Sequence, residues 1–474
     1  MKTECNTAKI EFQKHNTREV VGRFDGGAIS SDAGGLLLRE IERAAGVIAQ
    51  ASKCFTDYRN PEMIEHTVKE LVAQRVFALA HGHEDLNDHD TLRHDPLLAT
   101  LVGKADPMGL DRKRDADKGK PLAGAATLNR LELTADNVAE GERYKKIRLD
   151  MQKADLLLTN LFLQKPGPEP DTLILDLDAT DDPLHGDQEG KFFHGYYRCY
   201  CYLPLYITCG ESLLWAQLRP SNIDASAGSI EALGKIVPQI RDKWPDIRIV
   251  IRADSGFCRE EIMAWCEKPA NNVDYVLGLA KNERLKRKNH KAMKKARRLY
   301  LRTSAPARRY IHFKYSTLKT WSRSRRVIAK AEYIPGKENH RFVVTSLSSA
   351  EATPQALYED WYCARGDMEN RIKEQQLDLF ADRTSTHLMR SNQIRLWFSS
   401  LAYTLIQLLR EFALSGTPMA HAQCGTIREK LFKIGARIKI SVRKIWIHFS
   451  ESYPHQSLFS KIATKLKLLP DLAA

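Results

Sequence analysis

The spacing of apolar and polar residues divides the chain into helical and strand-like regions. Up to about residue 157 the apolar residues recur mostly at helical intervals, and a glycine-rich turn at residues 24–35 leads into a predicted helix at residues 36–45. From Thr172 the pattern changes to short apolar runs bounded by turn residues, which is typical of strands. After Pro354 helical spacing returns, and the chain stays mainly helical to its end. The pattern therefore predicts helical regions at both ends and an α/β region between them.

The predicted elements of the α/β region follow one another in a recognisable order. Three strands come first, and they are followed by a helix, a strand, a second helix and a fifth strand. This β-β-β-α-β-α-β order is that of the RNase H-like fold, so the sequence predicts an α/β domain of this type. The strands are predicted at residues 172–180, 202–209, 212–220, 247–254 and 274–280, and the helices at residues 225–243 and 260–267.

A basic segment and a second group of strands follow. Residues 285–302 are rich in Lys and Arg and contain no acidic residue, so this segment is either a solvated amphipathic helix or a contact to the DNA backbone. Residues 307–349 alternate in a strand-like way and predict a small β insertion. Further on, the apolar run from Leu396 to Leu409 is shorter than the ~20 residues that span a bilayer, so it predicts a buried core helix.

The composition indicates the kind of partner that the chain binds and the compartment in which it works. The 474-residue chain has a net charge of +14, which favours a polyanionic partner because cations set against phosphates release counterions. Its nine cysteines form no CxxC pair, and this scattered, odd set suits a reducing cytoplasm. The first 15 residues contain no apolar stretch typical of a signal peptide. We therefore expect a cytoplasmic protein that binds no membrane.

A His- and Asp-rich segment, residues 81–95, offers one metal site. A zinc enzyme built on this segment is one interpretation. The other is a polar connection between helices whose side chains are solvated or act as caps, and the spacings match no zinc pattern.

Three acidic residues offer a second metal site. Asp178 ends the first predicted strand, Asp254 ends the fourth, and neighbouring central strands would bring the two together. Glu369 lies in a helical segment in which Arg365 and Lys373, each four residues away, share its face. Each acid also has a simpler interpretation, as a turn or cap residue at a strand end or as a surface ion pair on the helix. Asp176 is an alternative to Asp178, because both side chains point to the same side of the strand.

Converging carboxylates are what two-metal phosphoryl transfer requires. Two divalent ions ~3.5–4 Å apart activate the attacking oxygen and stabilise the leaving one. Hard oxygen ligands suit Mg²⁺.

Four segments give the chain a resemblance to a known family. They are FDGGAISSDAGGLLLREIE, LDLDATDDPLHGDQEGKFFHGYY, IRADSGF and the segment with Tyr362, Arg365 and Glu369 that continues as ENRIKE. The chain resembles the DDE transposases of insertion sequences, in particular the family named for insertion sequence 1380. The wider group carries the signature Y-x2-R-x3-E-x6-K, but here the Lys position holds Gln376, and Lys373 is one turn earlier.

The resemblance implies a fold, a reaction and its partners. It implies an RNase H-like catalytic domain with a β-rich insertion and a triad of Asp178, Asp254 and Glu369 that holds two Mg²⁺ ions, with Mn²⁺ as an alternative ion. The implied reaction is hydrolysis at the ends of the element, followed by strand transfer into target DNA. The implied partners are double-stranded DNA, both terminal inverted repeats and target, and a second copy of the chain in a homodimer.

The resemblance also assigns contacts to DNA. Tyr362 and Arg365 would contact phosphates near the scissile bond, although Tyr362 could instead pack in the helix interface. In related enzymes the freed 3′-hydroxyl forms a hairpin, and an aromatic residue of the β insertion stacks on a flipped base. Trp321 is the candidate for that role or a core residue of the insertion. The full set of expected DNA contacts is Tyr362, Arg365, Lys373, Trp321, Arg323, Lys286, Arg287 and Lys288.

Five regions result from the pattern and the resemblance together. By analogy with the relatives, the mainly helical N-terminal region binds the element ends. The regions are residues 1–165 (N-terminal), 171–284 (first part of the core), 285–350 (basic helix and β insertion), 351–412 (second part of the core, with Glu369) and 413–474 (basic, helical C-terminal region).

Two other functions remain compatible with the residue types. An RNase H-like nuclease would hydrolyse DNA without strand transfer, and residue types do not separate it from a transposase. A DNA-binding protein derived from an inactive transposase would be favoured by the loss of a triad acid, whereas all three acids are present.

Overall fold

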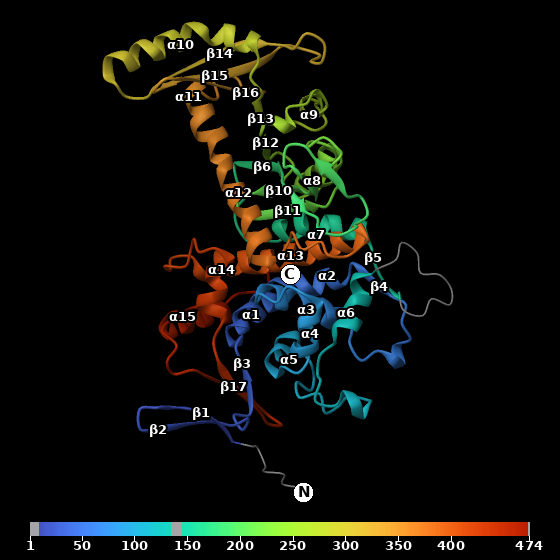
Figure 1. Ribbon diagram of the computed structural model, residues 1–474. Coiled ribbons are helices and arrows are strands. Elements are labelled where there is room, and N and C mark those ends of the chain that lie inside the picture. Colours follow the sequence, from blue (N-terminus) through green and yellow to red (C-terminus); the bar gives the residue numbers. More distant parts are fainter. Residues whose placement is uncertain (1–8, 134–144, 473–474) are drawn as a thin grey trace. The chain divides into compact units, whose positions relative to one another are not determined.

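The structure, a computed structural model, describes residues 9–133 and 145–472 and divides into two compact units (Figure 1). The central unit is residues 150–407. The terminal unit combines the described residues up to 149 with residues 408–472. The sequence thus contributes its two ends to one unit, whereas the pattern predicted separate N-terminal and C-terminal regions. Residues 1–8, part of the stretch from which we expected no signal peptide, lie outside the described residues.

The central unit is built on a mixed sheet of eight strands. All five predicted strands are present, as β6, β10, β11, β12 and β13, and β6 lies between antiparallel β10 and parallel β12. Parallel β13 follows β12. The order across the sheet is β11 (Ser212–Gln217), β10 (Leu205–Cys209), β6 (Thr172–Ala179), β12 (Arg248–Ala253), β13 (Val273–Leu279), β16 (Lys337–Thr345), β15 (Arg325–Ile334) and β14 (Ala307–Tyr315).

The predicted β insertion extends this sheet. Strand β16 pairs antiparallel with β13, so β14, β15 and β16 continue the same sheet and do not form a separate one. The predicted basic helix is present as α10 (Glu283–Thr303), and Asn282 caps its first turn by accepting a hydrogen bond from the Leu285 amide at 3.0 Å. Its buried residues recur every three or four positions, as one face of a helix requires, and they pack on β14 and β15.

Helices cover both faces of the sheet (Figure 1). One face packs against the apolar sides of α8 and α9 in a core that includes Leu175, Leu177 and Ile251. The smaller core on the other face contains Val250, Val276 and the helical turn η6. The remaining helices and turns of the unit are α7 (Met151–Leu163), α8 (Ser229–Lys243), α9 (Glu260–Cys266), α11 (Pro354–Ala356), η6 (Leu357–Tyr362), η7 (Cys363–Arg365), α12 (Gly366–Lys373), η8 (Glu374–Asp378) and α13 (Met389–Leu409), whose last residues belong to the terminal unit.

A small three-stranded sheet stands beside the main sheet. It is formed by β7 (Asp182–Pro183), β9 (Cys199–Tyr202) and β8 (Phe192–His194), with β9 in the middle. Helix α7 was predicted as part of the N-terminal region, but it packs on β11 and α8 and therefore belongs to the central unit. The predicted core helix of residues 396–409 is confirmed, because α13 is buried along this stretch.

The terminal unit joins segments from both ends of the sequence. Strand β3 pairs antiparallel with β17, and Gly34 lies against the C-terminal segment so closely that a Cβ there would be 1.7 Å from the Leu431 carbonyl oxygen. The glycine-rich turn therefore serves packing. The elements of the unit are α1 (Leu36–Ala45), α2 (Val47–Ser52), α3 (Val68–Ala80), α4 (His89–Leu92), α5 (Pro96–Val102), α6 (Ala125–Glu132), α14 (Cys424–Ile427), α15 (Gln456–Lys467), β1 (Ile10–His15), β2 (Arg18–Gly22), β3 (Ala28–Ser30), β4 (Phe55–Asp57), β5 (Ile147–Leu149), β17 (Ala436–Ile440) and β18 (Ile445–Phe449).

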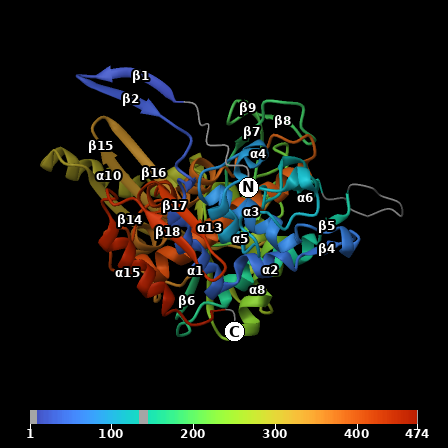
Figure 2. The same cartoon turned by 90° about the horizontal axis from the view of Figure 1, so that it is seen from below.

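The C-terminal region, predicted as mainly helical, also contains two strands. Residues 436–449 form the β17–β18 hairpin (Figure 2). Its segments ARIKI and IWIHF alternate with a period of two, and the buried residues of β17, Ala436 and Ile438, lie on one face of the strand, while its edge pairs with β3. This short alternation between helical stretches was missed. In residues 9–133 and 145–472, no helix is long and apolar enough to cross a membrane.

Candidate active site

Adjacent parallel strands deliver two aspartates to one edge of the sheet. Strand β12 pairs with β6 in a register that sets Ala253 opposite Leu177. Asp178 and Asp254 are the next residues on the two strands, so the register places them beside each other. The Asp254 carboxylate accepts a hydrogen bond from the Gly256 amide at 2.8 Å and thereby caps the turn η5 (Ser255–Phe257). This cap holds Asp254 at the strand end.

Asp176 lies on the same face of β6 but has another role. Its two carboxylate oxygens accept hydrogen bonds from the Arg252 guanidinium at 2.5 and 2.7 Å, and Arg252 is its direct neighbour on β12. Arg252 also donates to the Trp361 carbonyl at 2.7 Å. Both side chains are buried. Asp176 is thus one half of a buried ion pair, and Asp178 is the aspartate that faces the pocket.

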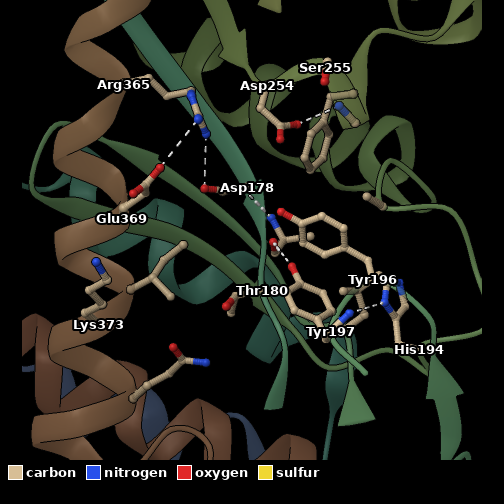
Figure 3. A pocket seen from close by; sticks show the side chains of 17 residues that line it. Asp178, Thr180, His194, Tyr196, Tyr197, Asp254, Ser255, Arg365, Glu369 and Lys373 are labelled. Carbon is tan, nitrogen blue, oxygen red and sulfur yellow. Dashed lines mark hydrogen bonds and ion pairs between the residues drawn. The ribbon is translucent and has the colours of Figure 1, made fainter. Parts of the chain in front are cut away.

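Helix α12 and the turn η7 that leads into it bring the third acid and two basic residues to the same place. The Arg365 guanidinium lies 3.3 Å from an Asp178 oxygen and 3.6 Å from a Glu369 oxygen, so one cation bridges the two acids (Figure 3). The Glu369 side chain is 52% exposed, whereas that of Asp178 is 15% exposed. Glu369 can therefore change its position more easily than Asp178.

All three acids line one pocket of about 560 Å³ in the central unit. Strand β6, the turn after β12 and helix α12 each supply one of them. The other lining residues are Ala179, Thr180, His194, Tyr196, Tyr197, Leu203, Ala225, Ser255, Gly256, Phe257, Arg365, Ile372, Lys373 and Gln376.

Negative charge is concentrated around Asp178, because the carboxylates of Asp254 and Glu369 lie near it. Burial raises the pKa of Asp178 to about 6, and the carboxylates of Asp254 and Glu369 add to the rise, while the Arg365 charge opposes it. The positive charge of Arg365 therefore does not fully compensate the burial of ionised Asp178 and its repulsion from the other two carboxylates. A cation between these carboxylates would relieve their mutual repulsion.

The donor set fits divalent metal ions in its chemistry. Three carboxylates on one pocket offer hard oxygen ligands of the kind Mg²⁺ prefers. Within the described ranges 9–133 and 145–472, no three His, Cys, Asp or Glu side chains are grouped closely enough to hold a metal ion. Arg365 lies between two of the acids, so metal binding would have to exchange this guanidinium for the ion and draw Glu369 inward.

Gln376, which stands at the Lys position of the signature, has hydrogen-bond partners that suit a neutral side chain. The Gln376 amide donates to the Asp182 carboxylate at 2.8 Å and to the Asp181 carbonyl at 3.0 Å. Burial raises the pKa of Asp182 to about 8, Asp382 and Asp181 add to the rise, and the bond from Gln376 opposes it. At neutral pH Asp182 is therefore mostly uncharged, and a neutral amide is a suitable partner. Lys373 lines the pocket one turn before Gln376.

Tyr362 lies close to the aspartates but packs tightly. Its hydroxyl would be 2.6 Å from a Cβ added to Gly278, and its ring centroid is 5.7 Å from that of Tyr358. These are the contacts of a residue in the helix interface. A contact of Tyr362 with DNA stays a prediction.

The expected DNA-binding residues of the insertion fall into two groups. Arg287 and Lys288 are exposed on α10, whereas Lys286 is half-buried and pairs with Glu283 at 2.6 Å. Trp321 is half-buried against the main core, edge-on to Tyr315 and beneath the Arg325 guanidinium. Those contacts are typical of a core residue. Arg323 pairs with Glu267 at 3.0 Å.

Sequence reasoning missed the aromatic wall of the pocket. His194, Tyr196 and Tyr197 lie across the pocket from Arg365 and Glu369 (Figure 3). They belong to the β8–β9 hairpin. The density of aromatic residues in KFFHGYYRCY was the signal that could have found them.

The His- and Asp-rich segment of the terminal unit consists of separate polar contacts. His81 is buried and bonds the Phe77 carbonyl at 2.6 Å, His83 pairs with Asp32 at 2.9 Å, and His89 bonds Gln74 at 2.9 Å. Each histidine has its own partner, so the segment resembles the polar connection and gives the zinc interpretation no support.

A comparison with protein families gives a match over nearly the whole chain. A family model described as "Transposase DDE domain group 1" matches residues 12–471. Among solved structures, the chain is similar to the cryo-EM structure of a piggyBac transposase synaptic complex with hairpin DNA, with a TM-score of 0.41 and 11% identity over 92% of this chain and 82% of that chain. A search of curated proteins found no match.

Proposed function

Because this chain belongs to the family of group 1 transposase DDE domains, we propose that it cleaves the ends of an insertion sequence and joins them to target DNA by two-metal phosphoryl transfer. The observation that carries the mechanism is the convergence of Asp178, Asp254 and Glu369 on one pocket from three separate elements. The resemblance to the insertion sequence 1380 family supports the finer assignment.

The strand order supports an RNase H-like core. Strands β11, β10, β6, β12 and β13 are adjacent in this order, with β6 in the middle, and the first of the five along the chain is therefore the central one. The first two acids lie at the carboxyl ends of the neighbouring strands β6 and β12. Strands β14, β15 and β16 form the insertion between the second Asp and the Glu.

Each pocket residue has a proposed part in the reaction. Asp178, Asp254 and Glu369 would hold two Mg²⁺ ions, with Mn²⁺ as the alternative. When bound, such ions activate the attacking oxygen and stabilise the leaving one. Once released from the acids, Arg365 can direct its fork of N–H donors at a phosphate next to the scissile bond. Lys373, on the same helix, adds a second positive charge to the pocket.

We expect Mg²⁺ to stabilise the folded chain through these acids. A ligand at ten times its dissociation constant stabilises the folded state by about 1.4 kcal/mol, and this is measurable as a rise of the unfolding temperature. Asp254→Asn should remove the rise, whereas Asp246→Asn, a control at an exposed aspartate of the same unit, should keep it. An equal rise in both variants would place the metal site elsewhere.

Helix α10 is proposed to bind the DNA backbone. Its exposed residues Arg287, Lys291, Lys294 and Arg298 follow one another at helical spacing and form a cationic stripe opposite the buried face, and exposed Lys288 lies beside this stripe. Such a stripe neutralises phosphates without reading sequence.

The salt dependence of binding tests the stripe. Each lost phosphate contact lowers the slope of log K against log salt by about 0.9, so Arg287→Gln with Lys288→Gln should lower it by roughly 2. Affinity should fall equally for all duplex sequences, as measured by fluorescence anisotropy over a salt series. The matched control is Lys268→Gln with Lys337→Gln, two exposed lysines outside the stripe. If the control variant lowers the slope by the same amount, the change in salt dependence is due to the net charge of the chain and not to the stripe.

The terminal unit is proposed to bind the element ends, in line with the expectation for the N-terminal region. Its β17–β18 hairpin contains Arg437, Lys439, Arg443 and Lys444 without an acidic residue, and Trp446 is exposed on it. Pairing of two ends in a homodimer is part of the same proposal.

One assay separates the proposed function from its alternatives. A donor plasmid that carries the coding sequence with its flanking DNA is incubated with the purified chain, Mg²⁺ and a target plasmid, and new junctions are sequenced. Junctions between element ends and target support a transposase. Cleavage without joining would favour the nuclease, and binding without cleavage would favour the inactive relic.

A further inference from the structure

The β8–β9 hairpin presents aromatic rings to solvent beside the pocket. Tyr196 is 83% exposed and Phe193 is 58% exposed, and Phe192 and Tyr200 are exposed as well. Large apolar side chains that gather on a surface mark a binding site more often than chance exposure does. From Lys191 to Cys209 the chain contains the cations Lys191 and Arg198 and no acidic residue. The ligand of this hairpin is therefore expected to combine flat apolar faces with negative charge.

The turn of the hairpin fixes Tyr196 at the rim of the pocket. The Arg198 amide donates to the His194 carbonyl at 2.8 Å and closes the turn. Tyr197 is anchored below it, because its hydroxyl donates to the carbonyl of Ala179, the residue after Asp178, at 3.4 Å. The ring of Tyr196 stands edge-on to that of Tyr197, with centroids 5.0 Å apart at 86°. Tyr196 is thus held close to the acids by its neighbour while its own ring remains accessible.

The strands of the hairpin carry two further exposed rings, Phe193 and Tyr200, on the face opposite to that of pocket-lining His194, because side chains alternate along a strand. Phe193 and Tyr200 meet edge to face with centroids 5.5 Å apart, and the Lys191 ammonium lies 5.0 Å from the Tyr200 ring. Stacked bases and a phosphate backbone are recognised by this combination of rings and cations.

We propose that this hairpin, with Tyr196 at its centre, binds an unpaired nucleobase of the DNA strand next to the scissile phosphate. The proposal rests on the proposed function, since the pocket must hold DNA. It assigns base stacking to the catalytic core, whereas the resemblance assigns it to the β insertion. Trp321 of the insertion is enclosed by Tyr315 and Arg325, so its ring offers less surface for a base.

The test compares paired and unpaired DNA without catalysis. The full chain is titrated in EDTA with a duplex and with a forked DNA of the same sequence, whose single-stranded arm carries 2-aminopurine. The wild type should bind the fork more tightly and quench the 2-aminopurine emission through stacking. Tyr196→Ala should weaken fork binding roughly ten-fold, the order expected for one lost stacked base, and leave duplex binding within about two-fold.

Two further variants test whether the effect of Tyr196→Ala comes from the loss of its aromatic ring. Tyr196→Phe should bind the fork as the wild type does, because stacking needs the ring and not the hydroxyl. Tyr58→Ala makes the same change at a tyrosine that is 50% exposed in the terminal unit, and it should change nothing. The proposal is overturned if the wild type shows no fork preference, if Tyr196→Ala retains it, or if Tyr196→Phe loses it to the same extent. Absence of binding to either DNA would instead overturn the proposed function itself.

Discussion

Asp178→Asn is expected to lower the rate of DNA cleavage by about 10³-fold or more while the chain remains folded. The carboxamide replaces one charged oxygen ligand of the proposed metal pair, and several kcal/mol of transition-state stabilisation correspond to three or more powers of ten in rate. Single-turnover cleavage of an end-containing duplex in Mg²⁺ measures the effect. Asp246→Asn, at an exposed aspartate of the same unit, should retain the rate.

The free energy of unfolding at neutral pH should not fall with Asp178→Asn, although cleavage does. The pKa of Asp178 is raised from 3.8 to about 6 in the folded chain, so the folded state binds more protons than the unfolded state between these values. Stability contributed by the protonated group is therefore present at low pH and is lost as pH rises from about 4 to about 6. The carboxamide of the variant cannot ionise and should remove this loss. Denaturant unfolding at pH 4.5 and 7.5 should show a smaller decrease for the variant, and a large destabilisation at pH 7.5 would contradict the site geometry.

Asp176→Ala is expected to destabilise the folded chain by roughly 3–5 kcal/mol, because it leaves the buried Arg252 guanidinium without its carboxylate. Denaturant unfolding measures the change, and the transition to follow is that of the central unit. Activity per folded molecule at low temperature should fall much less than in Asp178→Asn. The second control is the pair Asp176→Leu with Arg252→Met, which replaces both charges by apolar side chains and should recover much of the lost stability.

We thus expect substitution of Asp178 to reduce mainly cleavage and substitution of Asp176 to reduce mainly stability. If Asp176→Ala leaves stability unchanged and abolishes cleavage, Asp176 is the metal ligand and the triad shifts by two residues along β6. If both substitutions destabilise equally, neither residue faces an open pocket. The distinction matters because Asp176 and Asp178 share one face of the strand, and only their partners differ.

Arg365 connects the acids of the pocket with the proposed reaction. In the structure it contacts both Asp178 and Glu369, and it carries the positive charge that these acids otherwise lack. Binding of metal ions would release it toward a phosphate. The same side chain can therefore stabilise the acids before DNA binds and contact the substrate afterwards.

The sequence by itself determined the local elements and the candidate acids. Apolar runs that end in Asp178 and Asp254 predicted the strands β6 and β12, and the basic helix and the buried core helix were found as α10 and α13. These features are encoded by residues within a few positions of one another, because strand alternation and helical spacing are local periodicities. The short alternation of residues 436–449 was local too, and it was missed between helical stretches.

Only the tertiary structure decided which side chains meet. Asp176 and Arg252 are 76 positions apart, and their pairing depends on the register of β6 against β12. The joining of β16 to β13, the pairing of β3 with β17 and the position of Tyr196 at the pocket rim also arise from contacts between distant segments. Asp176 and Asp178 share one face of β6, so the register of β6 against β12 sets which of them pairs with Arg252 and which lines the pocket.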